Sequence, residues 1–457
     1  MSQFSVSMPS LLSGQGIDVA STVSQLASAA RAPETDWQSQ QTTILQQQSN
    51  LNQLNTELSA LLDKITTLND SSGVLSSATT TSSNSSVVTA TAVAGTSAQS
   101  HLVVVSNLAA TASFYSAAQS SSSTQLGSGS FSITVGTGST AQTQSFDVTN
   151  KTLAQVAQDI NNATSLGLNA TVIHDSSGYR LAIVADNSGA ASDFAVTNDH
   201  SGLGLTRGST GKDAVAIIDG VPVSSANNTI SGAISGVTFN LGQPSATEVQ
   251  VTVAPDQSAA VQAVTDFVNA YNTLITDLNS QFTVSVDSTG TGTNTNALET
   301  DSSARAVQQE LLTLVSHSYG SGAYSTLTAL GVSMNDDGTL SIDSTKLNSV
   351  AKTNLTDIVN FFQSNGSFGT TLTTELSKMT DVNKGVFNVD LNSLQSNYQS
   401  LQNQIDDLEL YVASRQQQWT TEYNRLNVAL LMWPLQQQEM DALFGTGSYS
   451  SNSTSSK

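Results

Sequence analysis

Two stretches near opposite ends of the chain carry apolar residues at alternating intervals of three and four. In residues 391–430 the apolar seam positions are Leu391, Leu394, Tyr398, Leu401, Ile405, Leu408 and Val412. The pattern continues more weakly through Arg415, Trp419, Glu422 and Leu426. An interval that averages about 3.5 residues keeps one stripe facing a partner helix in a left-handed coiled coil. The stretch contains no proline or glycine, and it predicts a helix of about 60 Å at the α-helical rise.

The second stretch, residues 37–68, supplies a partner of similar length. Its apolar seam positions are Ile44, Leu51, Leu54, Leu58, Leu61, Ile65 and Leu68, and Gln47 fills one further position. Two matched heptad patterns on opposite sides of the sequence predict an antiparallel helical stem formed by both termini. The pattern leaves open whether this stem also packs between subunits.

A shorter helix is predicted before the second stretch. Asp18 is a good N-cap because its carboxylate accepts the free amides of the first turn. Arg31 lies near the predicted C-terminal end, where a cation suits the helix dipole. Pro33 fits the first turn of the helix that follows, since its missing N–H is not needed there.

In the middle of the chain, apolar and polar residues alternate with the period of two that is typical of β-strands. Residues 69–86 are rich in Ser and Thr and predict a linker or loop. Strands are expected at residues 87–91, 101–105, 131–135, 168–174, 179–185, 214–218, 237–241 and 248–254, with a short amphipathic helix at 153–162. The middle is therefore expected to form two small β-rich domains.

Helical periodicity returns after residue 257. Helices are expected at residues 258–278 and 304–315, followed by a hairpin at 336–338, a helix capped by Asp343 and a short helix closing at 360–362. Residues 285–296 predict a flexible loop, and the chain after Gly445 predicts a disordered tail.

This nested order predicts a multidomain α+β fold, in which a long antiparallel helical coiled-coil stem from both termini encloses inserted β-rich domains. The expected segments are a terminal helix (1–36), the first half of the stem with a linker (37–84), an inner β domain in two parts (85–125 and 211–257), an outer inserted α/β domain (126–210), a helical domain with the second half of the stem (258–430) and a partly disordered C-terminal segment (431–457).

Composition narrows the classes of partner. Only 11% of the 457 residues are charged, against about 25% in typical soluble proteins. The formal net charge is −21, a field that repels phosphate backbones, so nucleic acid is not an expected partner. The chain has no cysteine, which excludes disulfides, thiolate metal sites and cysteine nucleophiles.

Targeting signals are weak. Residues 1–12 contain no Lys or Arg and no long apolar core, so a cleaved secretory leader is not expected. No window approaches 18 apolar residues, which predicts no membrane span.

No catalytic or metal-binding pattern is present. The four histidines are scattered in sequence, without metal-ligand spacing: His101, His174, His200 and His317. Asp406, Asp407 and Glu409 resemble paired carboxylates, but on the predicted helix they form its solvated face. We therefore expect a protein that is not an enzyme, with no catalytic residue, no cofactor and no metal.

Several short motifs resemble those of a known family. They include Gly16-Ile17-Asp18, Arg31 and Pro33 near the start, Phe267-Val268 with Tyr271-Asn272 after the β-rich middle, and Asp337-Gly338 in the predicted hairpin. Their order and spacing, with the helical ends, resemble the flagellar filament cap proteins, also called hook-associated protein 2 (the FliD family).

The resemblance implies a structural role. Such a protein would be secreted and would lie outside the cell at the distal tip of the bacterial flagellum, as a homo-oligomeric ring that is commonly a pentamer. It would promote flagellin insertion and filament elongation and prevent flagellin loss. The implied partners are flagellin, the hook–filament junction proteins, a cytoplasmic export chaperone with the type III export apparatus and, in pathogens, host mucin.

One departure and two alternatives accompany this resemblance. Pro434 lies where the family continues its C-terminal helix, and a proline inside a helix costs about 3 kcal/mol, so a kink or helix end is expected near Met432. The alternatives are a related secreted axial protein at the hook–filament junction and a surface adhesin.

Overall fold

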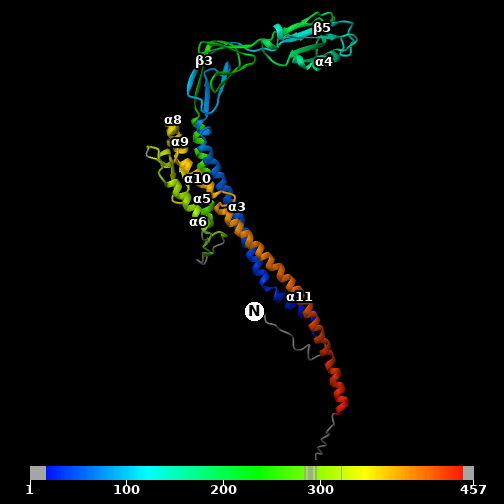
Figure 1. Cartoon of the computed structure of the whole chain (residues 1–457), viewed down its shortest axis with the longest axis vertical. Helices are drawn as coiled ribbons and strands as arrows, with labels where there is room; N and C mark the ends of the chain where they lie inside the picture. The colour runs from blue at the N-terminus through cyan, green and yellow to red at the C-terminus, as the bar shows by residue number, and fades with distance from the viewer. Residues whose placement is uncertain (1–16, 283–284, 287–291, 294–295, 321, 446–457) are drawn as a thin grey trace, which may run out of the picture.

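The protein is an elongated molecule with a helical stem at one end and β-rich regions at the other (Figure 1). The computed structural model describes residues 17–282, 285–286, 292–293, 296–320 and 322–445. The chain rises along the stem, forms the β-rich regions, returns through a group of helices and descends the stem again. The expected multidomain α+β fold with terminal helices around a β-rich middle is confirmed.

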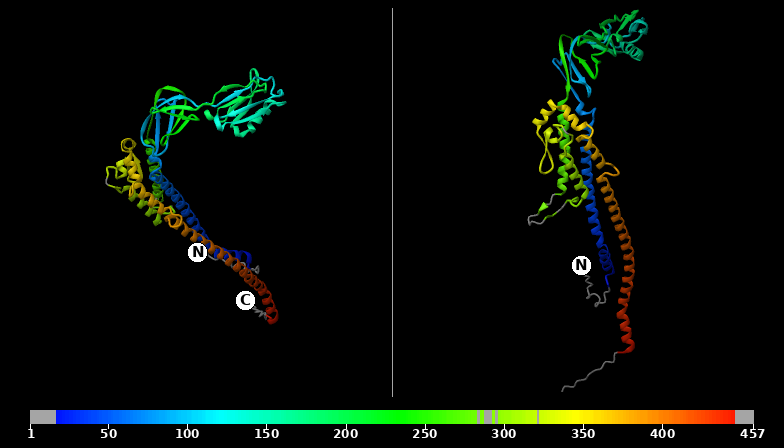
Figure 2. Two further views of the ribbon diagram at one scale, coloured as in Figure 1. Left: turned by 45° about the horizontal axis from the view of Figure 1, so that its top comes forward. Right: turned by 60° about the vertical axis from the view of Figure 1, so that its left-hand side comes forward.

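Three helices form the stem: α2 (Val19–Ala30), α3 (Ala32–Asn69) and α11 (Val386–Phe444). The Asp18 carboxylate accepts a hydrogen bond from the Ser21 N–H at 3.1 Å, and Pro33 lies in the first turn of α3, as the sequence predicts. Figure 2 shows α3 and α11 side by side and running in opposite directions below the other helices. The chain therefore makes an antiparallel stem from its own two ends.

A helical region covers the upper part of α3. It comprises α5 (Gln257–Phe282), α6 (Ser302–Ser316), α7 (Leu327–Leu330), α8 (Ser344–Thr353), α9 (Leu355–Gln363) and α10 (Phe368–Met379). The hairpin of β18 (Val332–Met334) and β19 (Leu340–Ile342) lies beside α5, and the short pair β16 (Ser285–Val286) and β17 (Gly292–Thr293) follows α5. A cluster of aromatic rings fills the centre, and Phe361 stacks on Phe368 with ring centroids 5.1 Å apart.

The inner β region joins the stem. One sheet has the order β1-β15-β3-β11-β12, formed by β1 (Ala78–Ser82), β15 (Ser245–Pro255), β3 (Gln99–Asn107), β11 (Ala214–Ile218) and β12 (Val221–Ser225). The other has the order β13-β14-β2, formed by β13 (Thr229–Ile234), β14 (Val237–Leu241) and β2 (Val88–Ala92). Valine side chains from β2, β3 and β15 meet Phe239 of β14 in one buried cluster.

The outer β region lies farthest from the stem. One sheet has the order β10-β4-β8-β7, formed by β10 (Thr206–Ser209), β4 (Ser113–Tyr115), β8 (Gly178–Ala185) and β7 (Leu168–Asp175). The other has the order β6-β5-β9, formed by β6 (Gln142–Asp147), β5 (Ser130–Val135) and β9 (Phe194–Thr197), and α4 (Leu153–Asn162) completes the core. A capping box between Thr152 and Gln155 begins α4.

The structure corrects two expectations. Residues 69–86 are not only a linker, because they contain the 3-10 turn Val74–Ser76 and strand β1, which pairs with β15. The helix does not end near Met432, since α11 continues through Pro434 to Phe444. Residues 431–443 are all exposed, so the helix around Pro434 packs against no other described element and can adjust locally to the proline ring.

Two further expectations fall partly or wholly outside the described residues. Within the predicted loop 285–296 the structure describes the β16–β17 pair, and the residues between these strands are outside the described ranges. The tail after Gly445 lies wholly outside them. Among the described residues, no helix is long and apolar enough to cross a membrane.

Candidate functional site: the helical stem

Helix α3 is the element on which the stem and the helical region are both built. Its seam residues from Leu51 to Leu68 are buried in one cluster with residues of α5, α6 and α8–α10. Ile44, closer to the start of α3, is also buried. Gln47 takes no part in this apolar seam, because its Nε2 donates to the Ala297 carbonyl at 2.9 Å. The upper half of α3 is thus enclosed by helices, whereas its lower half lies against α11.

The seam positions of α11 fall into an upper and a lower group. Leu391 and Leu394 pack partly buried against the helical core. Lower down, Leu401, Ile405 and Val412 are buried and Tyr398 and Leu408 are half-buried. Among the described elements, α2 and α3 are the helices that lie beside this lower part of α11 (Figure 2). These side chains all face the ascending helices, which is the arrangement that a coiled-coil seam requires.

The lowest part of the seam changes register. Arg415 and Trp419 are half-buried, but Glu422 and Leu426 are exposed. Tyr423 and Asn427 are half-buried in their place. Intervals of four residues follow Trp419, so the contact stripe drifts around α11 beside α2.

The first described residues hold α2 against α11. The Ile17 N–H donates to the Asn427 side-chain oxygen at 2.7 Å, 410 positions apart in sequence. At the junction of α2 and α3, Arg31 Nη1 lies 3.5 Å from a Glu34 carboxylate oxygen and 4.0 Å from a Glu409 carboxylate oxygen. Ile17, Asp18, Arg31 and Pro33 therefore all lie along the lower stem, and Gly16 is outside the described residues.

The other family-like residues lie in the helical region. Phe267, Val268 and Tyr271 of α5 are buried in the core, and burial raises the pKa of the Tyr271 hydroxyl. Asn272 Nδ2 donates to the Leu340 carbonyl at 2.7 Å, and its Oδ1 accepts from the Leu340 N–H at 2.6 Å. The Asn272 amide thus pairs with β19 as a neighbouring strand would, and it fixes the hairpin on α5.

The hairpin turn contains the last two family-like residues. Asp337 Oδ1 accepts hydrogen bonds from the Thr339 hydroxyl at 2.6 Å and the Thr339 N–H at 3.0 Å, and these bonds hold the pKa of the Asp337 carboxyl below its usual range. Gly338 has φ +83°, and a Cβ there would lie 2.7 Å from Leu312 Cδ2. A side chain there is therefore strained by the backbone conformation, and the end of the Leu312 side chain would have to shift to admit it.

Polar side chains also join α3 to α5. Asn50 donates to Gln281 at 2.9 Å, Gln53 donates to Asp277 at 2.6 Å and Lys64 lies 3.4 Å from Asp266. Beside them, burial of the Glu57 carboxyl, followed by its hydrogen bond with Asp277, raises the pKa of Glu57 to about 7. This interface therefore contains one carboxyl group, that of Glu57, which changes charge near neutral pH.

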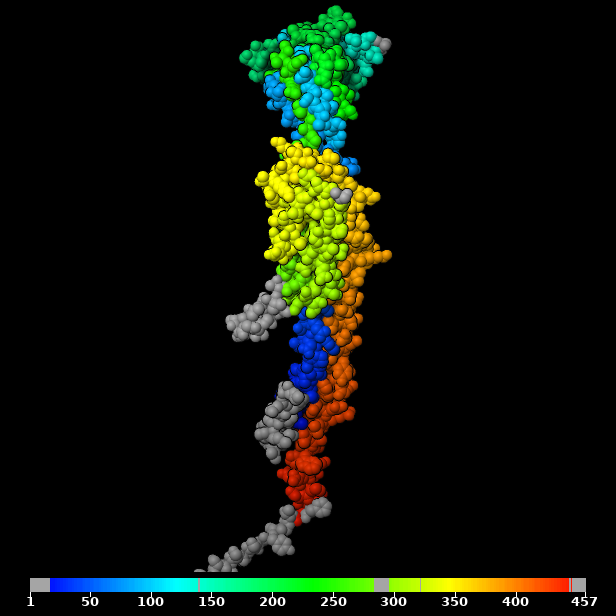
Figure 3. All heavy atoms as spheres, turned by 90° about the vertical axis from the view of Figure 1, so that its left-hand side faces the viewer, coloured from blue at the N-terminus to red at the C-terminus, as the bar shows by residue number. Residues whose placement is uncertain are grey.

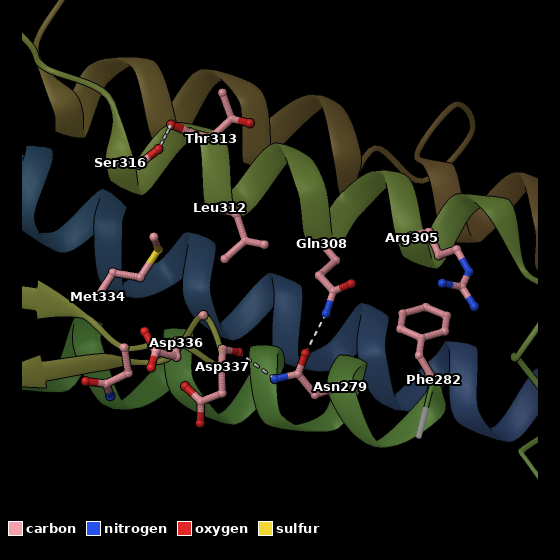
Figure 4. Close-up of a pocket in the computed structure, with 12 residues that line it drawn as sticks. Asn279, Phe282, Arg305, Gln308, Leu312, Thr313, Ser316, Met334, Asp336 and Asp337 are labelled. Carbon is pink, nitrogen blue, oxygen red and sulfur yellow. Dashed lines mark hydrogen bonds between the residues drawn. The ribbon is translucent and has the colours of Figure 1, made fainter. Parts of the chain in front are cut away.

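A groove of about 660 Å³ lies between α5, α6 and the β18–β19 hairpin (Figure 4). The guanidinium of Arg305 lies over the Phe282 ring, 4.2 Å from its centroid. Gln308 donates to Asn279 at 2.6 Å, and Asn279 donates to the Asp337 carbonyl at 2.8 Å. These side chains satisfy one another, which is the behaviour of a structural junction between elements.

The histidines are in separate environments. His101 is buried and its Nδ1 lies 2.6 Å from an Asp219 carboxylate oxygen, a bond that holds the pKa of Asp219 low. His174 and His317 each pack against a tyrosine ring, Tyr179 and Tyr319, and His200 Nδ1 lies 3.0 Å from the Asn198 carbonyl. Over the described ranges, no three His, Asp or Glu residues are arranged to hold a metal ion.

The lower end of α11 has no partner among the described residues. Figure 3 shows it continuing past the end of the ascending helices. Large apolar side chains are exposed there: Leu431, Met432, Trp433, Leu435, Met440 and Leu443. The chain thus carries an apolar helix surface at the tip of the stem.

Two models of one protein family match most of these elements. The model described as flagellar hook-associated protein 2 N-terminus matches residues 15–113, and the one described as its C-terminus matches residues 211–432. Together they cover both halves of the stem, the helical region and the inner β region.

Individual relatives agree with this match. The chain is 27% identical over 411 residues to the B-type flagellar hook-associated protein 2 of Pseudomonas aeruginosa, covering 82% of this chain and 85% of that protein. It is 27% identical over 433 residues to the flagellar hook-associated protein 2 of Escherichia coli K12, covering 88% and 92%. The fold is similar to the crystal structure of the flagellar cap protein FliD D1-D2-D3 domains from Escherichia coli, with a TM-score of 0.58 and 23% identity over 76% of this chain and 99% of that one.

Proposed function

This chain belongs to the flagellar hook-associated protein 2 (FliD) family, and we propose that it caps the distal tip of the bacterial flagellar filament. The observation that carries the proposal is the match of both family models over the stem and the regions beside it. Members of this family are structural components of the flagellum rather than enzymes. The hook–filament junction and adhesin alternatives are not favoured, since both models and the relatives bear the cap family's name.

The proposed action is mechanical. Several copies would form a ring, with the β-rich regions as a plate and the stems as legs that contact the filament. The plate would retain flagellin that emerges from the central channel, promote its insertion and prevent its loss. The exposed apolar end of α11 supports the leg role, because a surface of this kind is normally covered in an assembly. A ring of five subunits rests on the family resemblance alone.

The same proposal includes the route to the filament tip. The chain would be secreted unfolded through the flagellar type III export apparatus and would act outside the cell. A cytoplasmic chaperone would cover the apolar residues 431–443 before export, and the hook–filament junction proteins would meet the stem. The resemblance also implies contact with host mucin in pathogens.

A division into domains is also proposed. Three separate clusters of buried residues support a helical domain with the stem (37–84 and 258–430), an inner β domain (85–125 and 211–257) and an outer domain (126–210). Strand β4 pairs with β8, and Ala112 and Phe114 join the outer cluster, so the outer domain would also include β4.

Deleting the gene tests the cap function. The deletion strain should retain hooks, lack full-length filaments and shed flagellin monomer into the medium, and the intact gene should restore filaments. Full-length filaments in the deletion strain would refute the proposal.

A further inference from the structure

Two segments join the inner β region to the outer β region. Residues 108–112 lead outward from β3, and residues 210–213 lead back into β11. They pair at one point, where the Ala110 and Lys212 backbones exchange hydrogen bonds of 2.9 Å and 3.1 Å. We call these two segments the linker. Figure 1 shows the outer region turned away from the line of the stem at this junction.

Apolar packing does not hold this junction. Among the described residues, the buried cluster of the inner region and that of the outer region have no member in common. Two domains without a large apolar interface normally move relative to one another. A two-stranded connection is itself only marginally stable. A fixed angle between the two regions therefore needs other contacts.

Polar side chains tie the linker to both regions. Asn228 Oδ1, in the inner region, accepts a hydrogen bond from the Ala109 N–H at 2.7 Å. Asn107 Nδ2, at the end of β3, donates to the Asp213 carbonyl at 2.7 Å. On the outer side, the Asp213 carboxylate accepts from the Ala190 N–H at 2.7 Å. Because this last bond ends on a carboxylate, it is stronger than a bond between neutral groups.

One contact bypasses the linker and joins the two regions directly. The Ser188 hydroxyl of the outer region donates to the Ala226 carbonyl of the β12–β13 loop at 2.7 Å. The next residue, Gly189, has φ +104°, and a Cβ there would lie 2.9 Å from Ala226 Cβ and 3.0 Å from Ala226 Cα. The two loops are therefore too close to admit a side chain at position 189 unless one of them shifts.

We propose that this direct contact, together with the ties to the linker, locks the junction, so that the inner and outer β regions form one rigid arm at a fixed angle. Ser188 and Gly189 are the positioning residues of the lock, because they supply the outer region's side of the direct contact. A rigid arm would keep the plate of the proposed ring in one shape while subunits arrive beneath it. That consequence rests on the proposed cap function, whereas the lock itself does not.

The distance between two spin labels tests the lock, because the chain has no cysteine of its own. Gln250→Cys on β15 and Gln158→Cys on α4, both exposed positions, place one label on each region. Double electron–electron resonance on the labelled full-length protein should give one narrow distance. Ser188→Ala removes one hydrogen bond and should raise the population of other distances about fivefold. A broad distribution with the native junction would overturn the proposal.

A matched pair of glycines separates the lock from backbone strain. Gly189→Ala places a methyl group against Ala226 and should broaden or shift the distance between the labels. Gly202, also in the outer region, has φ +72°, and a Cβ there meets nothing within 4 Å. Gly202→Ala therefore carries a similar backbone penalty and should leave the distance narrow. Hydrogen exchange in β8 and β14 verifies that both regions stay folded in each variant.

The outcomes distinguish the lock from the cap function. A distance in folded Gly189→Ala that stays as narrow as with the native junction would overturn the proposal, as would equal broadening in Gly202→Ala. In the deletion strain, the gene carrying Gly189→Ala should give shorter filaments than the gene carrying Gly202→Ala. Full-length filaments from Gly189→Ala, with the distance broadened, would refute only the consequence for the plate.

Discussion

The two flanks of α3 are joined to their neighbours by different chemistry. Toward α11, three pairs of uncharged amides join the helices (Gln41 with Gln402, Gln48 with Gln395 and Asn55 with Asn388), and the one charged contact, Arg31 with Glu409, lies at the junction with α2. Toward α5, the contacts include Lys64 with Asp266 and the carboxyl pair of Glu57 and Asp277. Both flanks surround the same apolar seam. The difference teaches that one helix can present one face that responds to pH and salt and another that does not.

The largest expected effect on the free energy of unfolding comes from truncating a side chain in the apolar seam that both flanks share. Leu58 is fully buried in the cluster that α3 forms with the helical region, so Leu58→Ala should lower the free energy of unfolding by about 3 kcal/mol through lost burial and a cavity. Urea denaturation followed by circular dichroism measures this free energy of unfolding. Leu45→Ala, at a position 51% exposed on the same helix, should change it by less than about 0.5 kcal/mol. Equal effects at the two positions would show that the seam is not the common core.

A smaller, local effect is expected in the lower stem. Leu401→Asp with Leu408→Asp places two charges in the α3–α11 seam, and we expect melting of the lower stem at a cost of about 2 kcal/mol. Hydrogen exchange should report faster exchange in residues 398–430 while α5 and α10 stay protected. Leu410→Asp, at a position 72% exposed on α11, is the matched control. Unchanged protection in the double variant would contradict a seam at these positions.

The dependence of the unfolding free energy on pH distinguishes the two flanks of α3 directly. The folded-state pKa of Glu57 is about 7, above the ordinary value of 4.5, so the fold favours the protonated carboxyl. That contribution is complete below about pH 4.5 and is lost as the pH rises through 7. Glu57→Gln keeps a hydrogen-bond donor at every pH and should flatten this dependence, with a gain of about 1 kcal/mol or less at pH 8, because Glu57 is only partly buried.

The matched comparison for this pH effect uses the other flank. Gln48→Ala removes one amide pair and should leave the slope of unfolding free energy against pH between 5 and 8 as in the unmodified chain. Denaturation midpoints across this range give the slopes. A steep slope that persists in Glu57→Gln would assign the response to another group.

The smallest expected effect is that of salt. Lys64 and Asp266 are both substantially exposed, and such pairs contribute about 0.5 kcal/mol or less. Raising NaCl from about 0.1 M to about 1 M, which shortens the Debye length to about 3 Å, should weaken this pair. Lys64→Gln should therefore cost stability only at low salt, whereas Gln48→Ala should cost the same at both. A salt-dependent cost for Gln48→Ala would contradict the uncharged character of the α11 flank.

The sequence was most informative where local periodicity and burial coincide. The apolar spacing of residues 37–68 predicts α3, and its partner in α11 follows from the matching spacing of residues 391–430. Asp18 and Asp343 are found as the predicted helix caps because a cap depends on only a few adjacent residues. The multidomain order follows from the change of period between the ends and the middle of the chain.

Features that depend on distant partners were missed. Strand β1 lies in a Ser/Thr-rich stretch with little apolar signal, and it is a strand because β15 pairs with it. Pro434 predicted a kink or a helix end, but α11 does not end there and continues to Phe444. The amide pairs between α3 and α11 were overlooked because glutamine and asparagine carry no hydrophobic signal, although the seven-residue spacing of Gln41, Gln48 and Asn55 was available.

Electron microscopy of the purified full-length protein tests the cap account most directly. The account predicts closed rings, with the β-rich regions forming a plate and helical stems projecting from one face as legs. Single elongated particles or open fibres, at concentrations where the protein still restores filaments to the deletion strain, would contradict it.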